Sequence, residues 1–146
     1  SSAASDVYKR QDVTLLLIDD DDVDVMGIQR ALKKLEIHNP IVRARDGLEG
    51  LAKLRECHGA RKPYLVLLDL NLPKLNGLEL LAEVRKDPDI SSAVVFVLTT
   101  SKAEEDKLVA YKHNIAGYII KSQVSDGVMR AMDMLHGYWR VVELLA

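Results

Sequence analysis

The sequence predicts an α/β fold in which helices cover both faces of a five-stranded parallel sheet. Five short apolar runs alternate along the chain with stretches whose apolar residues recur at helical spacing. Short connections join them, and this alternation is typical of parallel sheets with right-handed crossovers. Covering both faces favours the doubly wound strand order 2-1-3-4-5, which is the flavodoxin-like arrangement of five strand–helix units.

The composition is that of an ordinary globular domain. The chain has 146 residues, of which 29% are charged and 48% hydrophobic, and its net charge of -2 argues against a nucleic-acid-binding surface. No run reaches the ~18 apolar residues of a membrane span. The single cysteine, Cys57, excludes an internal disulfide and a cysteine cluster for zinc, and we expect it on a helix, partly buried. We therefore expect a cytoplasmic protein that binds neither nucleic acid nor membrane.

The predicted strands are the apolar runs, and several of them end at charged residues. The run over 64–68 carries no charge, leads directly into Asp69, and suits a strand buried on both faces. Four consecutive aspartates, Asp19 to Asp22, follow the first strand, and we take Asp22 as the N-cap of the next helix. The other four strands are expected over 13–18, 41–44, 94–98 and 115–120.

The predicted helices follow each strand, and turn residues separate the elements. The pairs Asp46-Gly47 and Asn76-Gly77 are turn signals. Helices are expected over 23–35, 48–57, 78–86, 102–112 and 126–145, after a flexible lead over 1–12 and within one domain over 13–146. The last helix is long and has more apolar residues than one sheet contact needs. We therefore expect a homodimer formed through this helix and the adjoining fourth helix and fifth strand.

The residues that follow strands one, three, four and five are expected to meet in one pocket. In the order 2-1-3-4-5 these strands are neighbours about 4.8 Å apart, and the ligand site of such a sheet lies at the carboxyl ends of its strands. Strand two lies at the far edge and delivers no comparable group. The converging groups are three carboxylates, a hydroxyl and an amine, from Asp19, Asp20, Asp69, Thr99 and Lys121.

These groups suit phosphoryl transfer to a carboxylate. Carboxylates bind a hard divalent cation such as Mg²⁺, which commonly bridges them to phosphate. Transfer to a carboxylate gives an acyl phosphate, and the cation and an ammonium neutralise the phosphoryl oxygens. Each residue alone has a simpler explanation as a helix cap, a turn or a surface charge. The coincidence of four strands that end in the groups of one site favours the functional interpretation.

The chain resembles the receiver domains of two-component response regulators over about residues 13–145. The matching motifs, in family order, are Leu-Leu-Leu-Ile-Asp-Asp, Leu-Val-Leu-Leu-Asp-Leu-Asn-Leu-Pro-Lys-Leu-Asn-Gly, Val-Phe-Val-Leu-Thr-Thr-Ser and Gly-Tyr-Ile-Ile-Lys. The resemblance implies a single-domain regulator that takes phosphate from a histidine kinase and changes its partner or dimer surface. The phrases Asp-Leu-Asn-Leu-Pro and Leu-Thr-Thr-Ser, with Tyr-Trp near the end, further resemble stand-alone receivers that partner phytochrome-type kinases.

The resemblance also implies how the acids divide their roles. Asp69 would be the phosphoacceptor. Asp20 and Asp69 would bind Mg²⁺ directly, and Asp19 would help through water. The backbone carbonyl of Asn71 would complete the metal site.

The remaining site residues would read and stabilise the phosphoryl group. By resemblance, Thr99 is the switch hydroxyl and Lys121 the phosphate-binding amine. Tyr118 matches the aromatic residue whose rotamer follows the threonine, although on sequence grounds it equally suits an aromatic packed at the sheet edge. Two positions depart from the family pattern, because Ser122 stands where proline is usual and Thr100 where a small residue is usual.

Three other functions fit parts of the pattern. A phosphatase of the haloacid-dehalogenase type needs a second aspartate two residues after the nucleophile, where this chain has Asn71. A flavodoxin-like nucleotide binder needs a Gly/Ser/Thr-rich loop after strand one, where four aspartates would repel phosphate. A pseudo-receiver would lack part of the residue set, which is complete here. We therefore expect Mg²⁺-dependent self-phosphorylation and self-dephosphorylation, not turnover of a separate substrate.

Overall fold

The computed structural model describes residues 13–121, so the predictions for the N-terminal lead, Ser122 and the last helix lie outside the described part. Within it, the predicted alternation of strands and helices is confirmed, with small differences at element boundaries. The elements are β1 (Thr14–Ile18), α2 (Asp22–Lys34), β2 (Ile41–Ala44), α3 (Gly47–Gly59), β3 (Tyr64–Leu68), α4 (Gly77–Lys86), β4 (Val95–Thr99), α5 (Glu104–Lys112) and β5 (Gly117–Ile120).

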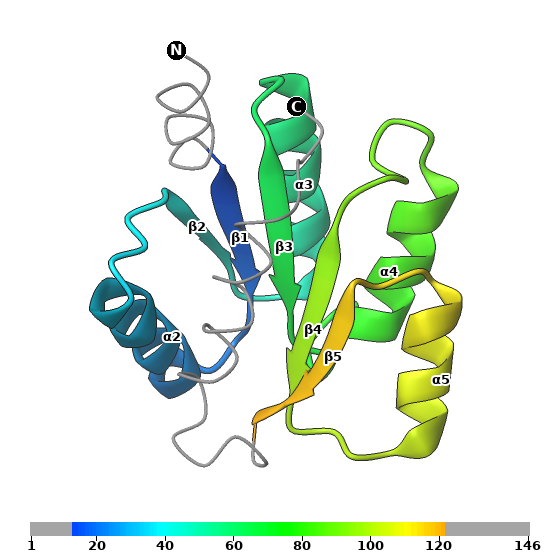
Figure 1. Ribbon diagram of the computed structural model, residues 1–146. Helices are drawn as coiled ribbons and strands as arrows, with labels where there is room; N and C mark the ends of the chain where they lie inside the picture. The colour runs from blue at the N-terminus through cyan, green and yellow to red at the C-terminus, as the bar shows by residue number, and fades with distance from the viewer. Residues whose placement is uncertain (1–12, 122–146) are drawn as a thin grey trace.

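The strands form one parallel sheet in the predicted order, β2-β1-β3-β4-β5. The register pairs Ile18 of β1 with Leu68 of β3 and Leu68 with Val97 of β4, and Thr99 pairs with Ile120 of β5. In Figure 1 all the arrows point the same way, so the carboxyl ends of the strands lie along one edge of the sheet. This register brings the residues that follow β1, β3, β4 and β5 close together.

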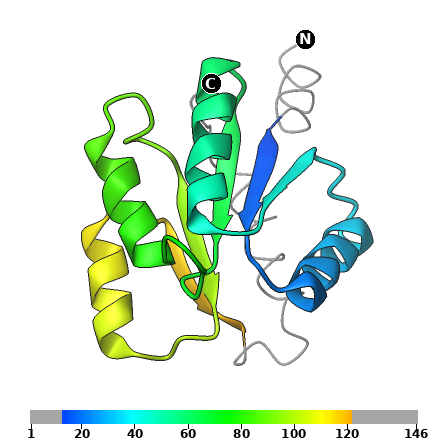
Figure 2. The ribbon, with the colours of Figure 1, turned by 180° about the vertical axis from the view of Figure 1, so that it is seen from behind.

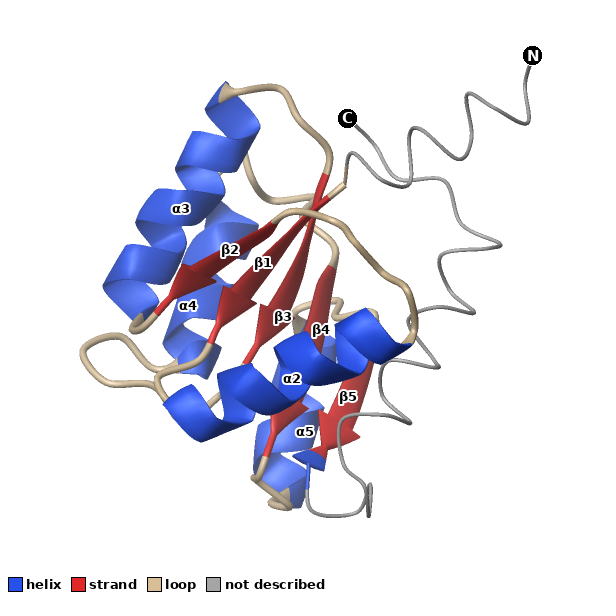
Figure 3. Cartoon of the chain, turned by 90° about the vertical axis from the view of Figure 1, so that its left-hand side faces the viewer, coloured by secondary structure: helices blue, strands red, loops and turns tan. Residues whose placement is uncertain are grey.

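Helices cover both faces of the sheet, which explains why its central strands are almost entirely apolar. Every residue of β1 is buried, and alternate side chains point to opposite faces. Leu15 and Leu17 pack with residues of α2 on one face, while Leu16 and Ile18 pack with residues of α3, α4 and α5 on the other. Figure 2 shows these last three helices in front of the sheet, and Figure 3 shows α2 and α3 on opposite sides of it.

The two pairs predicted as turns each start a helix. Asp46 is the N-cap of α3 and accepts a hydrogen bond from a backbone N–H of that helix. Asn76 is the N-cap of α4 in a capping box with Glu79, in which each side chain accepts from the other residue's backbone N–H. The glycine that follows is needed for close packing, because a Cβ on Gly77 would lie 2.5 Å from the Cα of Leu70. The start of α4 is thus pressed against the backbone that carries the acid after β3.

The prediction that Asp22 caps α2 is wrong by one residue. The N-cap is Asp21, whose side chain accepts from the backbone N–H groups of Val23 and Asp24 at 2.9 and 3.2 Å. Any of the four consecutive aspartates can cap a helix, so the sequence alone does not select one. The point at which the chain leaves β1 decides it, because the cap must have an extended backbone.

Two further expectations concern single features. Cys57 lies in α3 and is partly buried, as predicted. Among residues 13–121, none of the helices has the length and apolar character needed to cross a membrane.

Candidate functional site

The Lys121 ammonium lies among three carboxylates at the carboxyl edge of the sheet. Its Nζ is 2.7 Å from Oδ2 of both Asp19 and Asp24, and 3.1 Å from Oδ2 of Asp69. An ammonium has three N–H donors, so each carboxylate can accept one. The side chains of Lys121, Asp19 and Asp69 are only 9%, 2% and 7% exposed. The cluster is therefore a set of charges, three of them buried, that hold one another in place.

Both oxygens of the Asp69 carboxylate have partners that orient it. Its Oδ1 accepts hydrogen bonds from the Thr99 hydroxyl and from the backbone N–H of Asn71, each at 3.0 Å, while Oδ2 faces Lys121. Its own backbone N–H donates to the carbonyl of Ile18 at 2.9 Å, which extends the pairing of β3 with β1. The carboxylate is thus fixed by two neutral donors and one cation.

Asp24 is the member of this cluster that the sequence analysis missed. It comes from the first turn of α2, whereas the site residues predicted from the sequence all lie in strands or follow them. Because Asp21 caps the helix, the carboxylate three residues later belongs to a helical turn that starts directly beside the site. An acid at this distance from the cap is the signal that could have found it.

The acidic loop after β1 is compensated by arginines from β2 and its following loop. Arg43 donates through Nε and Nη2 to the carbonyl of Asp19, at 3.2 and 3.1 Å, and through Nη1 to Asp22. Arg45 donates to the same Asp22 carboxylate at 3.0 Å. The hydrogen bond from Arg43 and the charges of both arginines lower the pKa of Asp22. Strand β2 lies at the edge of the sheet, as predicted, and its contribution is to neutralise the acidic loop, which the sequence did not predict.

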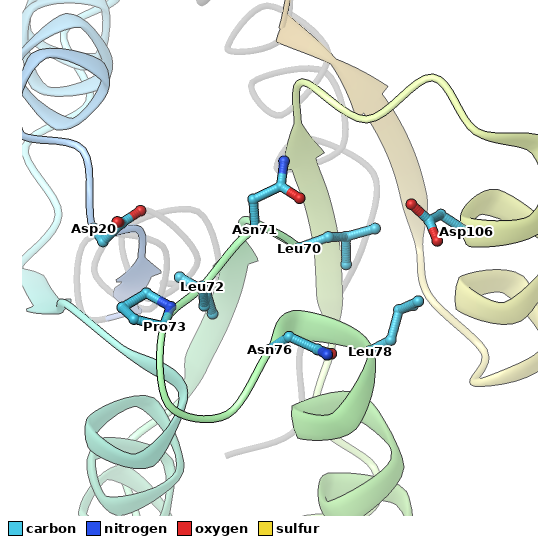
Figure 4. A pocket seen from close by; sticks show the side chains of 8 residues that line it. All are labelled: Asp20, Leu70, Asn71, Leu72, Pro73, Asn76, Leu78 and Asp106. Atoms are coloured by element: carbon cyan, nitrogen blue, oxygen red, sulfur yellow. The ribbon is translucent and has the colours of Figure 1, made fainter.

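Asp20 lies apart from the Lys121 cluster and faces a neighbouring pocket. It is exposed and lines a cavity of about 460 Å³, across which it stands opposite Asp106 of α5 (Figure 4). The other lining residues come from the loop after β3 and the start of α4: Leu70, Asn71, Leu72, Pro73, Asn76 and Leu78. Since Leu70 and Asn71 directly follow Asp69, this pocket adjoins the acid cluster.

Thr99 and Tyr118 are connected through the loop after β4. The fully buried Thr99 hydroxyl donates to Asp69 and also accepts from the backbone N–H of Ser101 at 3.3 Å. The Tyr118 hydroxyl donates to the Ser101 carbonyl at 3.0 Å. Burial raises the pKa of Tyr118, so the phenol stays protonated as a donor. The Ser101 hydroxyl in turn donates to Asp106, which ties the loop to α5.

Asn71 and Thr100 form a second link between the loops that flank Asp69. The side-chain amide of Asn71 donates to the Thr100 hydroxyl at 3.1 Å. The Thr100 hydroxyl therefore has a hydrogen-bonding role that an alanine or a glycine at this position would lack.

The donor set fits a hard divalent cation. Carboxylate oxygens of Asp19, Asp24 and Asp69 lie within 4.8 Å of one another, and such oxygens are the ligands that Mg²⁺ prefers. The Lys121 ammonium among them shows that these acids attract positive charge. Burial alone would lower the pKa of Lys121, but its hydrogen bonds to Asp19 and Asp24 and the charge of Asp69 raise it above its ordinary value.

Comparison with known proteins agrees with this geometry. The model of the family described as response regulator receiver domain matches residues 15–133. Response regulator Rcp1 of Synechocystis sp. is 35% identical over 128 residues, which cover 86% of this chain and 87% of the relative. The probable methanogenesis regulatory protein FilR2 of Methanothrix harundinacea is 34% identical over 139 residues, covering 93% of this chain and 90% of the relative.

Solved structures give the same result. The phosphorylated cyanobacterial phytochrome response regulator RcpA and the Mn²⁺-bound form of Rcp1 each superpose with a TM-score of 0.80 at 35% identity, covering 92% of this chain and 99% of theirs. A response regulator in red light signalling of R. palustris has a TM-score of 0.78 at 25% identity, with the same coverage. The chain therefore belongs to the receiver domains of two-component response regulators, which are phosphoryl acceptors and not catalytic enzymes.

Proposed function

We propose that the protein is a signalling switch that takes a phosphoryl group from a histidine kinase onto Asp69. The observation that carries the proposal is the setting of this carboxylate, buried at the carboxyl edge between two neutral donors and the Lys121 ammonium. Phosphoryl transfer depends mainly on such positioning and charge stabilisation. Because several similar proteins are phytochrome response regulators, a phytochrome-type kinase is the proposed donor.

The transfer step uses this chain's own residues in distinct roles. A carboxylate oxygen of Asp69 attacks the phosphorus of the phosphohistidine, and the departing imidazole nitrogen keeps the electron pair of the broken P–N bond. Lys121 exchanges its bond to Asp69 for one to a phosphoryl oxygen. The proposed holders of Mg²⁺ are Asp19, Asp20, Asp69 and the backbone carbonyl of Asn71. When bound, the cation supplies positive charge to the phosphoryl oxygens.

Loss of the phosphoryl group is proposed to be a slow self-hydrolysis. The position two residues after the phosphoacceptor is Asn71, whose amide cannot accept a proton from an attacking water. Its side chain is instead bound to Thr100 beside the acceptor. The protein therefore modifies and restores itself, without turnover of a separate substrate.

The proposed output is a change at the surface formed by α5 and β5. A phosphoryl oxygen offers the Thr99 hydroxyl a new acceptor, and movement of that hydroxyl changes its bond from Ser101. Because the Ser101 carbonyl holds the Tyr118 hydroxyl, the aromatic side chain responds to the same movement. We propose that this surface and the helix predicted over 126–145 form the contact with a partner or a second copy.

Mass spectrometry tests the central proposal. After incubation with acetyl phosphate and Mg²⁺, the intact protein is expected to gain one phosphoryl group, and Asp69→Asn is expected to gain none. Asp46→Asn serves as a matched control, because Asp46 caps α3 and has no contact with Lys121; it should gain the group as the wild type does. Failure of the wild type to gain the group from acetyl phosphate or a purified kinase would favour a pseudo-receiver.

A further inference from the structure

Asp24 shares the ammonium that the phosphorylation site depends on. Its 2.7 Å contact with Lys121 is as short as that of Asp19 and shorter than the 3.1 Å contact of Asp69. Asp24 is also more accessible, with 33% of its side chain exposed compared with 2% for Asp19. An acid from the first turn of a helix thus competes with the strand-end acids for one cation.

The charges around Lys121 do not balance. Three carboxylates surround one ammonium, so the cluster is negative before any phosphoryl group arrives. The arginines of β2 and its following loop are engaged elsewhere, because Arg43 and Arg45 both pair with Asp22. A carboxylate beside Lys121 repels an anion on Asp69 and attracts a divalent cation, and solvent screens both effects less in this partly buried pocket than at the exposed Asp22.

We propose that Asp24 is a positioning residue of the phosphorylation site, which engages part of the Lys121 charge and thereby favours cation binding over anion binding at Asp69. This role rests on the proposed function, because Asp24 would adjust the affinity of the proposed phosphorylation site for cations and anions. With Asp24 present, an anion on Asp69 receives less help from Lys121 and depends more on a divalent cation. With a neutral residue there, one N–H of Lys121 is released and one negative charge is removed, and both changes favour the anion.

The neutral variant Asp24→Asn provides the test, because it changes two affinities in opposite directions. Mn²⁺ binding to the unphosphorylated protein, followed by electron paramagnetic resonance of the free ion, is expected to weaken roughly threefold to tenfold. Binding of beryllofluoride, an anionic phosphoryl analogue, is followed by fluorine NMR at saturating Mg²⁺. We expect it to tighten by roughly the same factor.

Matched variants separate this role from general damage. Asp22→Asn removes the same charge from the same helical turn, but Asp22 pairs with arginines and not with Lys121; its affinity for beryllofluoride should stay near that of the wild type. Asp24→Glu keeps the charge and should stay near the wild type in both assays. Asp24→Ser is a second neutral variant, should the first fail to fold, and should behave like Asp24→Asn.

The outcomes are distinct. Opposite shifts in the neutral variant, restored by Asp24→Glu, support the proposal. Weakening of both affinities would show that Asp24 only supports the local structure, and unchanged affinities would show that its ion pair has no role in the site; either result overturns the proposal. Failure of the wild type to be phosphorylated would instead contradict the proposed function, and the Mn²⁺ comparison would still report on Asp24.

Discussion

At the scale of single residues, the two oxygens of the Asp69 carboxylate have different partners. Oδ1 accepts from Thr99 and from the backbone of Asn71, while Oδ2 faces the Lys121 cation. The Lys121 ammonium would interact with the negative charge of a phosphoryl group on Asp69. The Thr99 hydroxyl would move toward a phosphoryl oxygen. Because this hydroxyl also accepts a hydrogen bond from Ser101, its movement would reach the loop that leads to α5. Under the proposed function, stabilisation of the phosphoryl group would fall to Lys121 and signalling to Thr99.

Thr99→Ala is predicted to separate phosphorylation from its structural response. The phosphoryl adduct should still form on Asp69, because the attacking carboxylate and Lys121 remain. The resonance of a labelled Tyr118 ring should then change much less on phosphorylation, since the link through Ser101 is lost. Loss of the two hydrogen bonds of this hydroxyl, to Asp69 and from Ser101, should also lower the free energy of unfolding by about 1–3 kcal/mol, measured by urea denaturation. Thr99→Ser keeps the hydroxyl and should respond as the wild type does, and an undiminished Tyr118 response in Thr99→Ala would contradict the link.

At the scale of elements, the start of α4 packs against the loop after β3 and fixes its position. The Asn76–Glu79 capping box sets where α4 begins, and the backbone N–H of Gly77 donates to the carbonyl of Leu70 at 2.9 Å. A Cβ on Gly77 would lie 2.7 Å from the carbonyl oxygen of Asp69 as well as 2.5 Å from the Cα of Leu70. Both of these neighbours are backbone, so they cannot move aside without shifting the acid itself.

Gly77→Ala is therefore predicted to lower the free energy of unfolding by about 1–3 kcal/mol, the usual effect of forcing a methyl group into a packed site. It should also slow acetyl phosphate-dependent labelling of Asp69, because the loop that orients this carboxylate must shift. Denaturant unfolding and intact-mass kinetics measure the two effects. Gly59→Ala is the matched control at the end of α3, where a Cβ would meet nothing within 4 Å. A Gly77→Ala protein as stable and as quickly labelled as Gly59→Ala would show that the close approach does not matter.

At the scale of the whole molecule, the sheet was predictable because short stretches of the sequence indicate each strand and helix. Alternating apolar runs and helical stretches fix a parallel sheet, and the doubly wound order then places Asp19, Asp69, Thr99 and Lys121 at one edge. The pairings of Asp24 with Lys121 and of Arg43 with Asp19 are different. They join residues 97 and 24 positions apart in the sequence and depend on how a helix turn and an edge strand lie against the site. No periodicity in the sequence encodes those lateral positions.

The surface of α5 suggests how the molecule as a whole would change its associations. Leu108 and Tyr111 of this helix are 61% and 47% exposed. The helix is tied to Asp69 through Asp106, Ser101 and Thr99 in succession, by hydrogen bonds of 2.6, 3.3 and 3.0 Å. An apolar surface connected in this way to the proposed phosphoacceptor, Asp69, is suited to contacts that depend on phosphorylation.

We accordingly predict that the protein self-associates through α5, β5 and the last helix, more strongly with beryllofluoride and Mg²⁺ bound. Sedimentation velocity at micromolar concentration should show a dimer for the wild type and a monomer for Leu108→Glu, since a charge in the contact must be desolvated. Phosphorylation of Leu108→Glu by acetyl phosphate should be unchanged. Leu48→Glu is the matched control, because Leu48 is 56% exposed but lies on α3, and it should still dimerise. A wild type that stays monomeric in both states would contradict the dimer and leave a heterologous partner as the occupant of this surface.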